Sequence, residues 1–354
     1  MTQPGPLPPP LSSLPPMPPV YFPPPAAYPR RPSMLWGFVR GVLTSLLVSL
    51  FGFSVLLNVY LMFGDRGSSG VKTSVVRDGD AKHVIAVLPV SGVINGNTVA
   101  DVEAMLGEIE KDKTVKAVVL EVNTPGGEVT ASDVLYDRIL RLKKAHGWPV
   151  VVSMGALATS GGYYISCAAD GIVAQRTTWT GNIGVLIPRM NFSALAEKYG
   201  VTDQTIKSTG SDFKDATSSF KPETPENRAY FQQLADDTFA TFKQVVVTGR
   251  SLSAASVDKL ANGKVYLGPE AVKLNLVDQI GYLDDAVAMA TGKANLGGVS
   301  PKVVRYEKTR GLFESYAGGK LSLPSSAPGV NVAIDRSLVD DYLSPRPMYL
   351  WRGE

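Results

Sequence analysis

Ser160 is the residue of this chain whose neighbours best suit a nucleophile. It lies in the stretch ATSGGYYIS, where small residues surround its hydroxyl and Tyr163 and Tyr164 follow. A serine hydroxyl attacks a carbonyl carbon only when a base takes its proton. A serine in this position also suits the N-cap of a helix. The choice between the two roles depends on the base that the rest of the chain supplies.

Histidine is the first base to consider, because its pKa lies near neutrality. The chain has two: His83 at the entry to a strand-like run, and His146 in KKAHGWPV at a helix end. Both precede Ser160, which leaves a serine–histidine–acid triad open because the order of such triads varies between folds. Neither histidine has neighbours that indicate catalysis.

Lysine is the next candidate base, and IKSTGSDFKDATSSF offers Lys207 and Lys214. A neutral amine can take the serine proton, but the pKa of lysine must then fall from about 10.4 to about 7–8. Burial away from water produces such a shift. Spacing alone does not choose between the two lysines, and both also fit a solvated loop.

Two glycine-rich turns follow two strand-like runs: VNTPGGEV, with Gly126 and Gly127, and ATSGGYY, with Ser160 and Gly161. The carboxyl ends of parallel strands share one edge of a sheet, so the two turns can be neighbours. Glycine lets a backbone N–H approach a reacting atom closely, and two such groups can hold a developing oxyanion. Gly126 and Gly161 are the candidate donors, and Gly127 is a weaker one. Both turns also fit a second interpretation, in which they are only tight connections with no role in catalysis.

Strand-like and helical patterns alternate from about residue 82. The strand-like runs are HVIAVLPVSGVI, AVVLEVN, PVVVSMG and GIVAQ, and the helical patterns between them cover residues 98–111, 130–144 and 161–169. This alternation predicts an α/β fold with a mostly parallel sheet and flanking helices. Helices dominate later, over residues 191–199, 225–248, 254–260, 269–274 and 283–290. The longest of these patterns has a proline at its start and Gly249 at its end. Proline is favoured at the first position of a helix, and glycine is favoured just after its last.

The N-terminal part has a different composition. Residues 1–33 hold 14 of the 26 prolines, which predicts a disordered or polyproline II tail. Residues 41–63 carry no charge, and as a helix they would span about 35 Å against about 30 Å of hydrocarbon. We therefore expect an uncleaved transmembrane anchor over residues 34–64 and a linker over residues 65–81. Three arginines before the span and three basic residues after it leave the orientation open, with the clustered arginines favouring a cytoplasmic N-terminus.

Composition argues against several other classes. A net charge of +3 without zinc-finger spacing, a Walker lysine loop or a long basic run gives no reason to expect nucleic acid. Cys167 is the single cysteine, so an intrachain disulfide is impossible, and its apolar surroundings predict a small buried filler. Nothing in the residue pattern indicates a metal or an organic cofactor.

Several motifs resemble one known family. NTPGGEV, ATSGGYYISCAAD, TGNIGV and GSDFKD occur in this order, and together they resemble the signal peptide peptidase A family of membrane-anchored serine–lysine peptidases. GKVYLGPEAVKLNLVDQIGYLDDAV and RPMYLW are similar to later segments of that family. The resemblance covers about residues 82–350 and implies a ClpP/crotonase-like fold, with the peptidase domain expected over residues 82–295. After Gly292 the chain has more glycine, serine and proline, so we expect a peripheral C-terminal segment over residues 296–354.

The resemblance also implies residue roles. It assigns the nucleophile, the general base and two oxyanion donors to Ser160, Lys214, Gly126 and Gly161. It thereby selects Lys214 over Lys207. One departure concerns Asn182, which stands where the family usually has a serine thought to hydrogen-bond the lysine. An asparagine carbonyl can accept the same bond.

The family implies a serine endopeptidase with an extracytoplasmic catalytic domain. It would degrade remnant signal peptides and other membrane-associated peptides, lie against membrane lipid and assemble as a homo-oligomeric ring in which neighbouring protomers can share a dyad. An inactive membrane scaffold on the same fold is the first alternative, favoured by Asn182. An acyl-CoA hydratase or isomerase, which also pairs oxyanion N–H groups, is the second; the anchor and Lys214 argue against it.

Overall fold

A computed structural model describes residues 34–63, 70–309 and 347–351. The chain forms two compact units, Met1–Gly67 and Ser68–Glu354. The proline-rich tail predicted for residues 1–33 lies outside the described residues, as do residues 64–69 of the predicted anchor and linker and residues 310–346.

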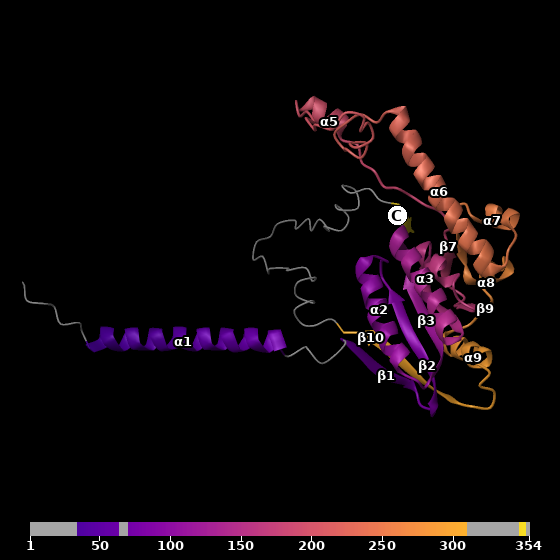
Figure 1. Cartoon of the computed structure of the whole chain (residues 1–354), viewed down its shortest axis with the longest axis horizontal. Coiled ribbons are helices and arrows are strands. Elements are labelled where there is room, and N and C mark those ends of the chain that lie inside the picture. Colours follow the sequence, from indigo (N-terminus) through magenta and orange to yellow (C-terminus); the bar gives the residue numbers. More distant parts are fainter. Residues whose placement is uncertain (1–33, 64–69, 310–346, 352–354) are drawn as a thin grey trace, which may run out of the picture. The chain divides into compact units, whose positions relative to one another are not determined.

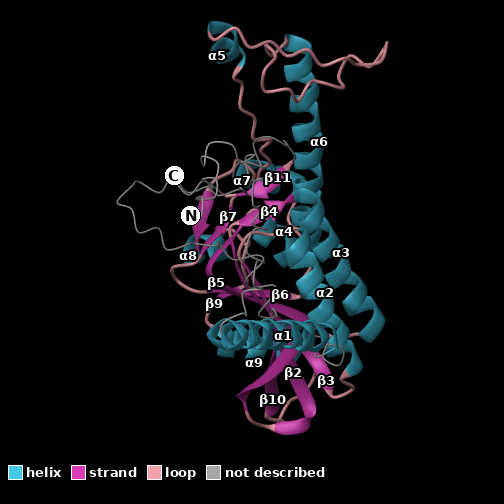
Figure 2. Cartoon of the chain, turned by 90° about the vertical axis from the view of Figure 1, so that its left-hand side faces the viewer, coloured by secondary structure: helices cyan, strands magenta, loops and turns pink. Residues whose placement is uncertain are grey.

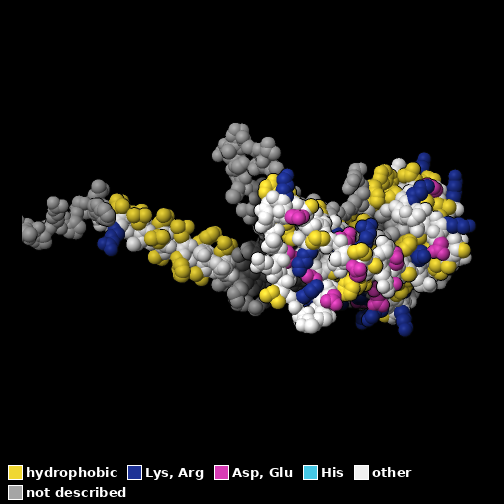
Figure 3. Space-filling view, turned by 90° about the horizontal axis from the view of Figure 1, so that it is seen from above, with side chains coloured by type: hydrophobic (Ala, Val, Ile, Leu, Met, Phe, Trp, Pro, Cys, Tyr) yellow, Lys and Arg dark blue, Asp and Glu magenta, His cyan; other side chains and the backbone are white. Residues whose placement is uncertain are grey.

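The first unit contains helix α1, Met34–Phe63. Within it, residues Gly37–Asn58 are apolar and long enough to cross a membrane, and none of that stretch is buried against protein. Figure 3 shows hydrophobic side chains along most of its surface. The helix covers the uncharged run that predicted an anchor, so the apolar helix is confirmed.

The second unit is built on a sheet that is mostly parallel. Its order is β1-β10-β2-β3-β5-β6-β9, with β7 beside β5 and β8 beside β7. All neighbouring pairs are parallel except β1 with β10 and β7 with β8. The strands are β1 Val71–Arg77, β2 Asp80–Ser91, β3 Val115–Thr124, β5 Val150–Thr159, β6 Gly171–Ala174, β7 Trp179–Gly181, β8 Val265–Leu267, β9 Gln279–Ile280 and β10 Pro301–Lys308.

Helices cover both faces of this sheet (Figure 1). Side chains alternate across a strand, so Val84, Ala86 and Leu88 of β2 join one buried core while Ile85 and Val87 join the other. The first core includes residues of α2 Gly96–Lys111, α3 Val129–His146, α4 Gly161–Ser166, α6 Pro225–Arg250, α7 Ala254–Leu260 and α8 Gly268–Lys273. The second includes residues of α9 Leu283–Lys293. The predicted α/β architecture is confirmed.

The longest helix of this unit, α6, ends later than its glycine indicated. The side chain of Thr224 caps its N-terminus and Pro225 occupies its first turn, as predicted. However, the helix passes through Gly249 and stops at Ser251, whose φ is 50°. Gly249 is needed for packing instead, because a side-chain carbon there would overlap the carbonyl oxygen of Cys167.

The chain outside residues 82–295 contributes more to the fold than the pattern indicated. The predicted linker includes β1 at the sheet edge, and the segment predicted to be peripheral includes β10, which lies between β1 and β2. A short strand β11, Met348–Leu350, pairs antiparallel with β4, Gly126–Glu128. The partners of β10 and β11 lie more than two hundred residues away, so no local pattern links them.

Candidate active site

Ser160 stands between β5 and α4 in a backbone conformation that is unusual for serine. Its φ is 55° and its ψ is −115°, a region that residues with a side chain rarely occupy. Its N–H donates to the carbonyl of Gly181 at 2.8 Å. Its hydroxyl makes no capping hydrogen bond, although the residue precedes the helix. A strained residue between a strand and a helix is a feature of nucleophilic serines, and the capping interpretation is wrong.

The two glycine turns meet beside this serine, as the parallel sheet predicted. Strands β3 and β5 run in parallel, and Thr124 at the end of β3 pairs with Ala158. A side-chain carbon on Gly126 would lie 2.6 Å from the nitrogen of Gly161 and 3.1 Å from the Cβ of Ser160. The φ of Gly126 is 95°, so both its conformation and its surroundings require glycine.

The backbone donors at this point differ in what they bind. Gly161 opens α4, where the first N–H groups of a helix have no acceptor within it. The N–H of Gly126 instead donates to the hydroxyl of Thr124 at 3.0 Å, and that hydroxyl donates to the carbonyl of Gly92. A developing oxyanion would therefore compete with Thr124 for this N–H. Thr124, a threonine within NTPGG, is a residue of the site that our sequence analysis did not single out.

Strand β11 of the chain itself covers this part of the site. Tyr349 pairs with Gly127 and Leu350 with Gly126. The ring of Tyr349 is fully buried and stacks on Tyr164 with centroids 4.9 Å apart. Ser160 is 1% exposed.

Lys214 is exposed and lies between α5, Ser193–Lys198, and α6. Figure 2 shows this part of the unit at the end of α6 that lies away from the sheet. Among the described residues, its side chain makes no hydrogen bond or ion pair. The structure therefore brings Ser160, Gly126 and Gly161 together, and it does not bring Lys214 to them within one chain.

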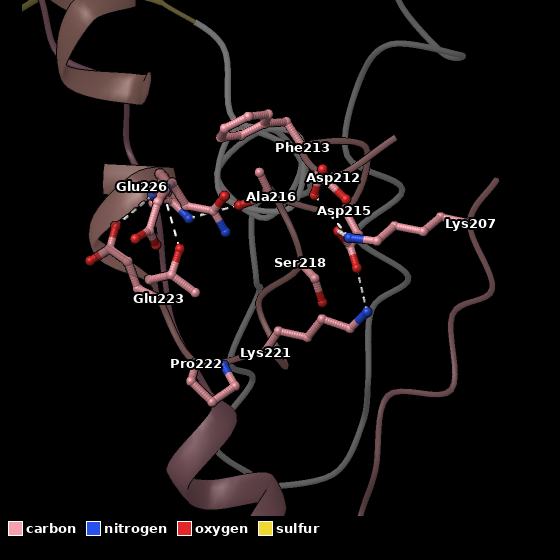
Figure 4. A pocket seen from close by; sticks show the side chains of 13 residues that line it. Lys207, Asp212, Phe213, Asp215, Ala216, Ser218, Lys221, Pro222, Glu223 and Glu226 are labelled. Atoms are coloured by element: carbon pink, nitrogen blue, oxygen red, sulfur yellow. Dashed lines mark hydrogen bonds and ion pairs between the residues drawn. The ribbon is translucent and has the colours of Figure 1, made fainter. Parts of the chain in front are cut away.

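Lys207 has a different environment from Lys214. Its Nζ donates to a carboxylate oxygen of Asp215 at 2.7 Å and to the backbone oxygen of Asp212 at 2.8 Å. Lys221 pairs with the other carboxylate oxygen of Asp215 (Figure 4). These two lysines hold the pKa of Asp215 down to about 2. Lys207 is thus engaged in an ion pair with Asp215.

Neither histidine lies near Ser160. On α3, Ser132 is packed against Gly161, and His146 follows 14 residues later, about 21 Å along a helix. On β2, the end at Ser91 pairs with β3 beside the glycine turn, and His83 stands about 26 Å away along the strand. His146 stacks on Trp148 with ring centroids 4.2 Å apart, so its contacts are structural.

Asn182 lies next to the site through its neighbour Gly181, which accepts the N–H of Ser160. Its φ of 52° falls in the left-handed region, which asparagine tolerates better than most residues with a side chain. Its amide nitrogen donates to the carbonyl of Gly263 at 2.6 Å. This bond orients the side-chain amide of Asn182. It uses the amide nitrogen as a donor and does not involve the amide oxygen.

Cys167 is buried, as its apolar surroundings predicted. Burial raises the pKa of its thiol to about 12, so it is neutral near pH 7 and packs as a small hydrophobe. Within the ranges that the structure describes, no three histidine, cysteine or acidic side chains gather so as to hold a metal ion.

Comparison with known proteins agrees with this geometry. The sequence profile of Peptidase family S49 matches residues 142–297, and that of Clp protease matches residues 83–178. A provisionally named signal peptide peptidase SppA of Enterococcus faecium is 34% identical over 305 residues, which are 81% of this chain and 86% of that protein.

Two longer relatives align with this chain over part of their length. Protease 4 of Haemophilus influenzae is 38% identical over 221 residues, 60% of this chain and 35% of that protein. The chloroplastic serine protease SPPA of Arabidopsis thaliana is 32% identical over 233 residues, 65% of this chain and 33% of that protein.

These findings define the class of protein first. The parallel sheet with its glycine turns has the Clp-protease-like fold, and the profiles mark a peptidase. The alignment with the Enterococcus protein covers most of both chains. The chain therefore belongs to peptidase family S49, the family of signal peptide peptidase A.

Proposed function

We propose that this chain is a membrane-anchored serine endopeptidase that uses Ser160 as nucleophile and Lys214 as general base. The observation that carries the proposal is the strained conformation of Ser160 beside Gly126 and Gly161. A fold that had no use for this hydroxyl would be more stable with glycine at a positive φ of this kind.

The proposed reaction is acyl transfer through Ser160. The neutral amine of Lys214 takes the proton of Ser160 as its oxygen attacks the carbonyl carbon of the peptide bond. The N–H groups of Gly161 and Gly126 stabilise the oxyanion of the tetrahedral intermediate. The ammonium of Lys214 then protonates the leaving amine, and water hydrolyses the acyl-enzyme by the same steps.

The base is proposed to come from a neighbouring copy of the chain. Lys214 is exposed in the segment between α5 and α6, which Figure 2 shows at the end of α6 that lies away from the sheet, whereas Ser160 lies between β5 and α4. Contact with a second copy would complete the dyad. It would also bury the amine, which lowers the pKa of a lysine toward the range that a general base needs.

The substrates are proposed to be remnant signal peptides and other membrane-associated peptides. The name of the Enterococcus relative supports this class. Helix α1 is long and apolar enough to anchor the chain in the same membrane. We further propose a cytoplasmic N-terminus and an extracytoplasmic catalytic unit.

The test uses the full chain in detergent with a fluorophosphonate probe and a quenched fluorescent peptide. We expect the probe to label Ser160, and Ser160→Ala and Lys214→Ala each to abolish peptide turnover while assembly, followed by size-exclusion chromatography, persists. Absence of labelling and turnover in the unmodified chain would identify an inactive scaffold. Turnover of an acyl-CoA instead would identify a hydratase. Turnover by Lys214→Ala would remove the proposed base.

A further inference from the structure

The residue after the proposed base is the centre of a charged cluster. Asp215 accepts Lys207 on one carboxylate oxygen and Lys221 on the other, and its side chain is 11% exposed. Figure 4 shows both lysine side chains reaching the carboxylate of Asp215. Lys207 precedes Asp215 by eight residues and Lys221 follows it by six, so the cluster ties together the whole segment around Lys214.

Further contacts hold the same segment, one of them against α6. Arg189 donates to the carbonyl of Ala216 at 2.9 Å and pairs with Glu223 at 2.7 Å. The ring of Phe213 lies 5.1 Å from that of Tyr230 on α6. The backbone on either side of Lys214 is therefore held, whereas the side chain of Lys214 itself makes no polar contact among the described residues.

We propose that Asp215 is a positioning residue for the reaction: by binding Lys207 and Lys221 it fixes the backbone from which Lys214 reaches the serine. The proposal rests on the proposed function, because it assumes that Lys214 is the base. None of the contacts described for Ser160 involves the residues of this clamp, so we expect loss of the clamp to affect the proton-transfer step and to change the affinity for peptide less.

The clamp requires an ionised carboxylate. Because the two lysines lower the pKa of Asp215 to about 2, the cluster is complete above the ordinary aspartate pKa of about 3.9 and is lost only as the pH falls through about 2. Asparagine at this position keeps the shape of the side chain and removes the charge. Two ammonium groups would then face each other without a carboxylate, and repulsion would separate them.

Asp212 provides a matched control. It lies two residues before Lys214 and is exposed, and Lys207 contacts its backbone oxygen rather than its carboxylate. Asp212→Asn therefore makes the same change of charge in the same segment and leaves the clamp intact. Asp215→Glu keeps the charge, so it tests whether a carboxylate on a longer side chain restores kcat.

The experiment measures kcat and KM with the full chain in detergent. We expect Asp215→Asn to lower kcat by about 10-fold to 100-fold, the size of effect that a 1 Å misplacement of a catalytic group produces, with KM changed less than about twofold. Asp212→Asn should keep the kcat of the unmodified chain, and Asp215→Glu should recover part of the loss. A Lys207→Met, Lys221→Met double variant should resemble Asp215→Asn.

Two controls make the result decisive. Thermal unfolding and size-exclusion chromatography establish that Asp215→Asn folds and assembles. If Lys214→Ala is inactive while Asp215→Asn keeps the kcat of the unmodified chain, the positioning role is overturned and the proposed function stands. If Lys214→Ala remains active, the proposed function itself fails. A fall of kcat in Asp212→Asn equal to that in Asp215→Asn would also overturn the clamp.

Discussion

At Ser160 the backbone conformation and the proposed chemistry favour different residues. The positive φ favours glycine, and the chemistry requires the side chain. Holding such a conformation costs of order 1–3 kcal/mol. Ser160→Gly should therefore unfold at a higher temperature than Ser160→Ala, by roughly 2–4 °C for about 1 kcal/mol, with both variants inactive. Differential scanning calorimetry measures this, and equal stability of the two variants would contradict the strain.

Gly126 offers a second test at the same scale. Gly126→Ala places a carbon against the Tyr349 carbonyl and the Gly161 nitrogen, which displaces the backbone and its N–H groups, so we expect peptide turnover to fall at least about 100-fold, as when an oxyanion donor is lost. Gly147 also has a positive φ, and a side-chain carbon there meets nothing within 4 Å. Gly147→Ala should thus lose about 1–2 kcal/mol of stability and keep full turnover. Equal turnover in the two variants would show that the surroundings of Gly126 are unimportant.

Within the helices, two glycines should respond in opposite ways to the same change. Gly107 of α2 has open space around it, and Gly249 of α6 lies against the Cys167 carbonyl. Gly107→Ala should stabilise the fold by about 0.5–1 kcal/mol, because alanine favours a helix. Gly249→Ala should destabilise it. Urea unfolding compares them, and stabilisation by Gly249→Ala would contradict the packing of α6 described above.

Strand β11 both stabilises the unit and covers the site. The ring of Tyr349 packs between Tyr164 and Phe242, and removal of a buried aromatic ring typically costs about 3–5 kcal/mol. A variant that ends at residue 346 should therefore unfold at lower temperature, yet react faster with a fluorophosphonate at Ser160. Slower labelling of a folded truncated chain would show that β11 builds the site rather than covers it.

The sequence predicted the local elements well and the long-range ones poorly. Apolar runs were enough to predict β2, β3 and β5, whose side chains are buried on both faces of the sheet, and helical spacing was enough for the helices between them. β10 and β11 were missed because their partners are distant in the chain. The two glycine turns were correctly expected to meet. The φ of Ser160 and the bond from Gly126 to Thr124 depend on packing that no spacing reveals.

At the scale of the whole molecule, the proposed dyad is divided between two places. Ser160 and the glycine turns lie at the ends of the parallel strands β3 and β5, and Lys214 is exposed between α5 and α6, a segment that Figure 2 shows at the end of α6 away from the sheet. A single copy would then carry the nucleophile of one site and the base of another. On this account activity depends on assembly, and dilution of the chain to monomers should abolish turnover before the fold is lost.

Mixing two inactive variants tests this division most directly. Ser160→Ala keeps Lys214, and Lys214→Ala keeps Ser160, so a mixed assembly would regain complete sites wherever one copy lends its lysine to its neighbour. We predict that each variant alone is inactive and that the two, co-expressed and purified together in detergent, recover peptide turnover with fluorophosphonate label only on the Lys214→Ala copy. A mixed assembly, verified by differently tagged copies, that stays inactive would contradict the account.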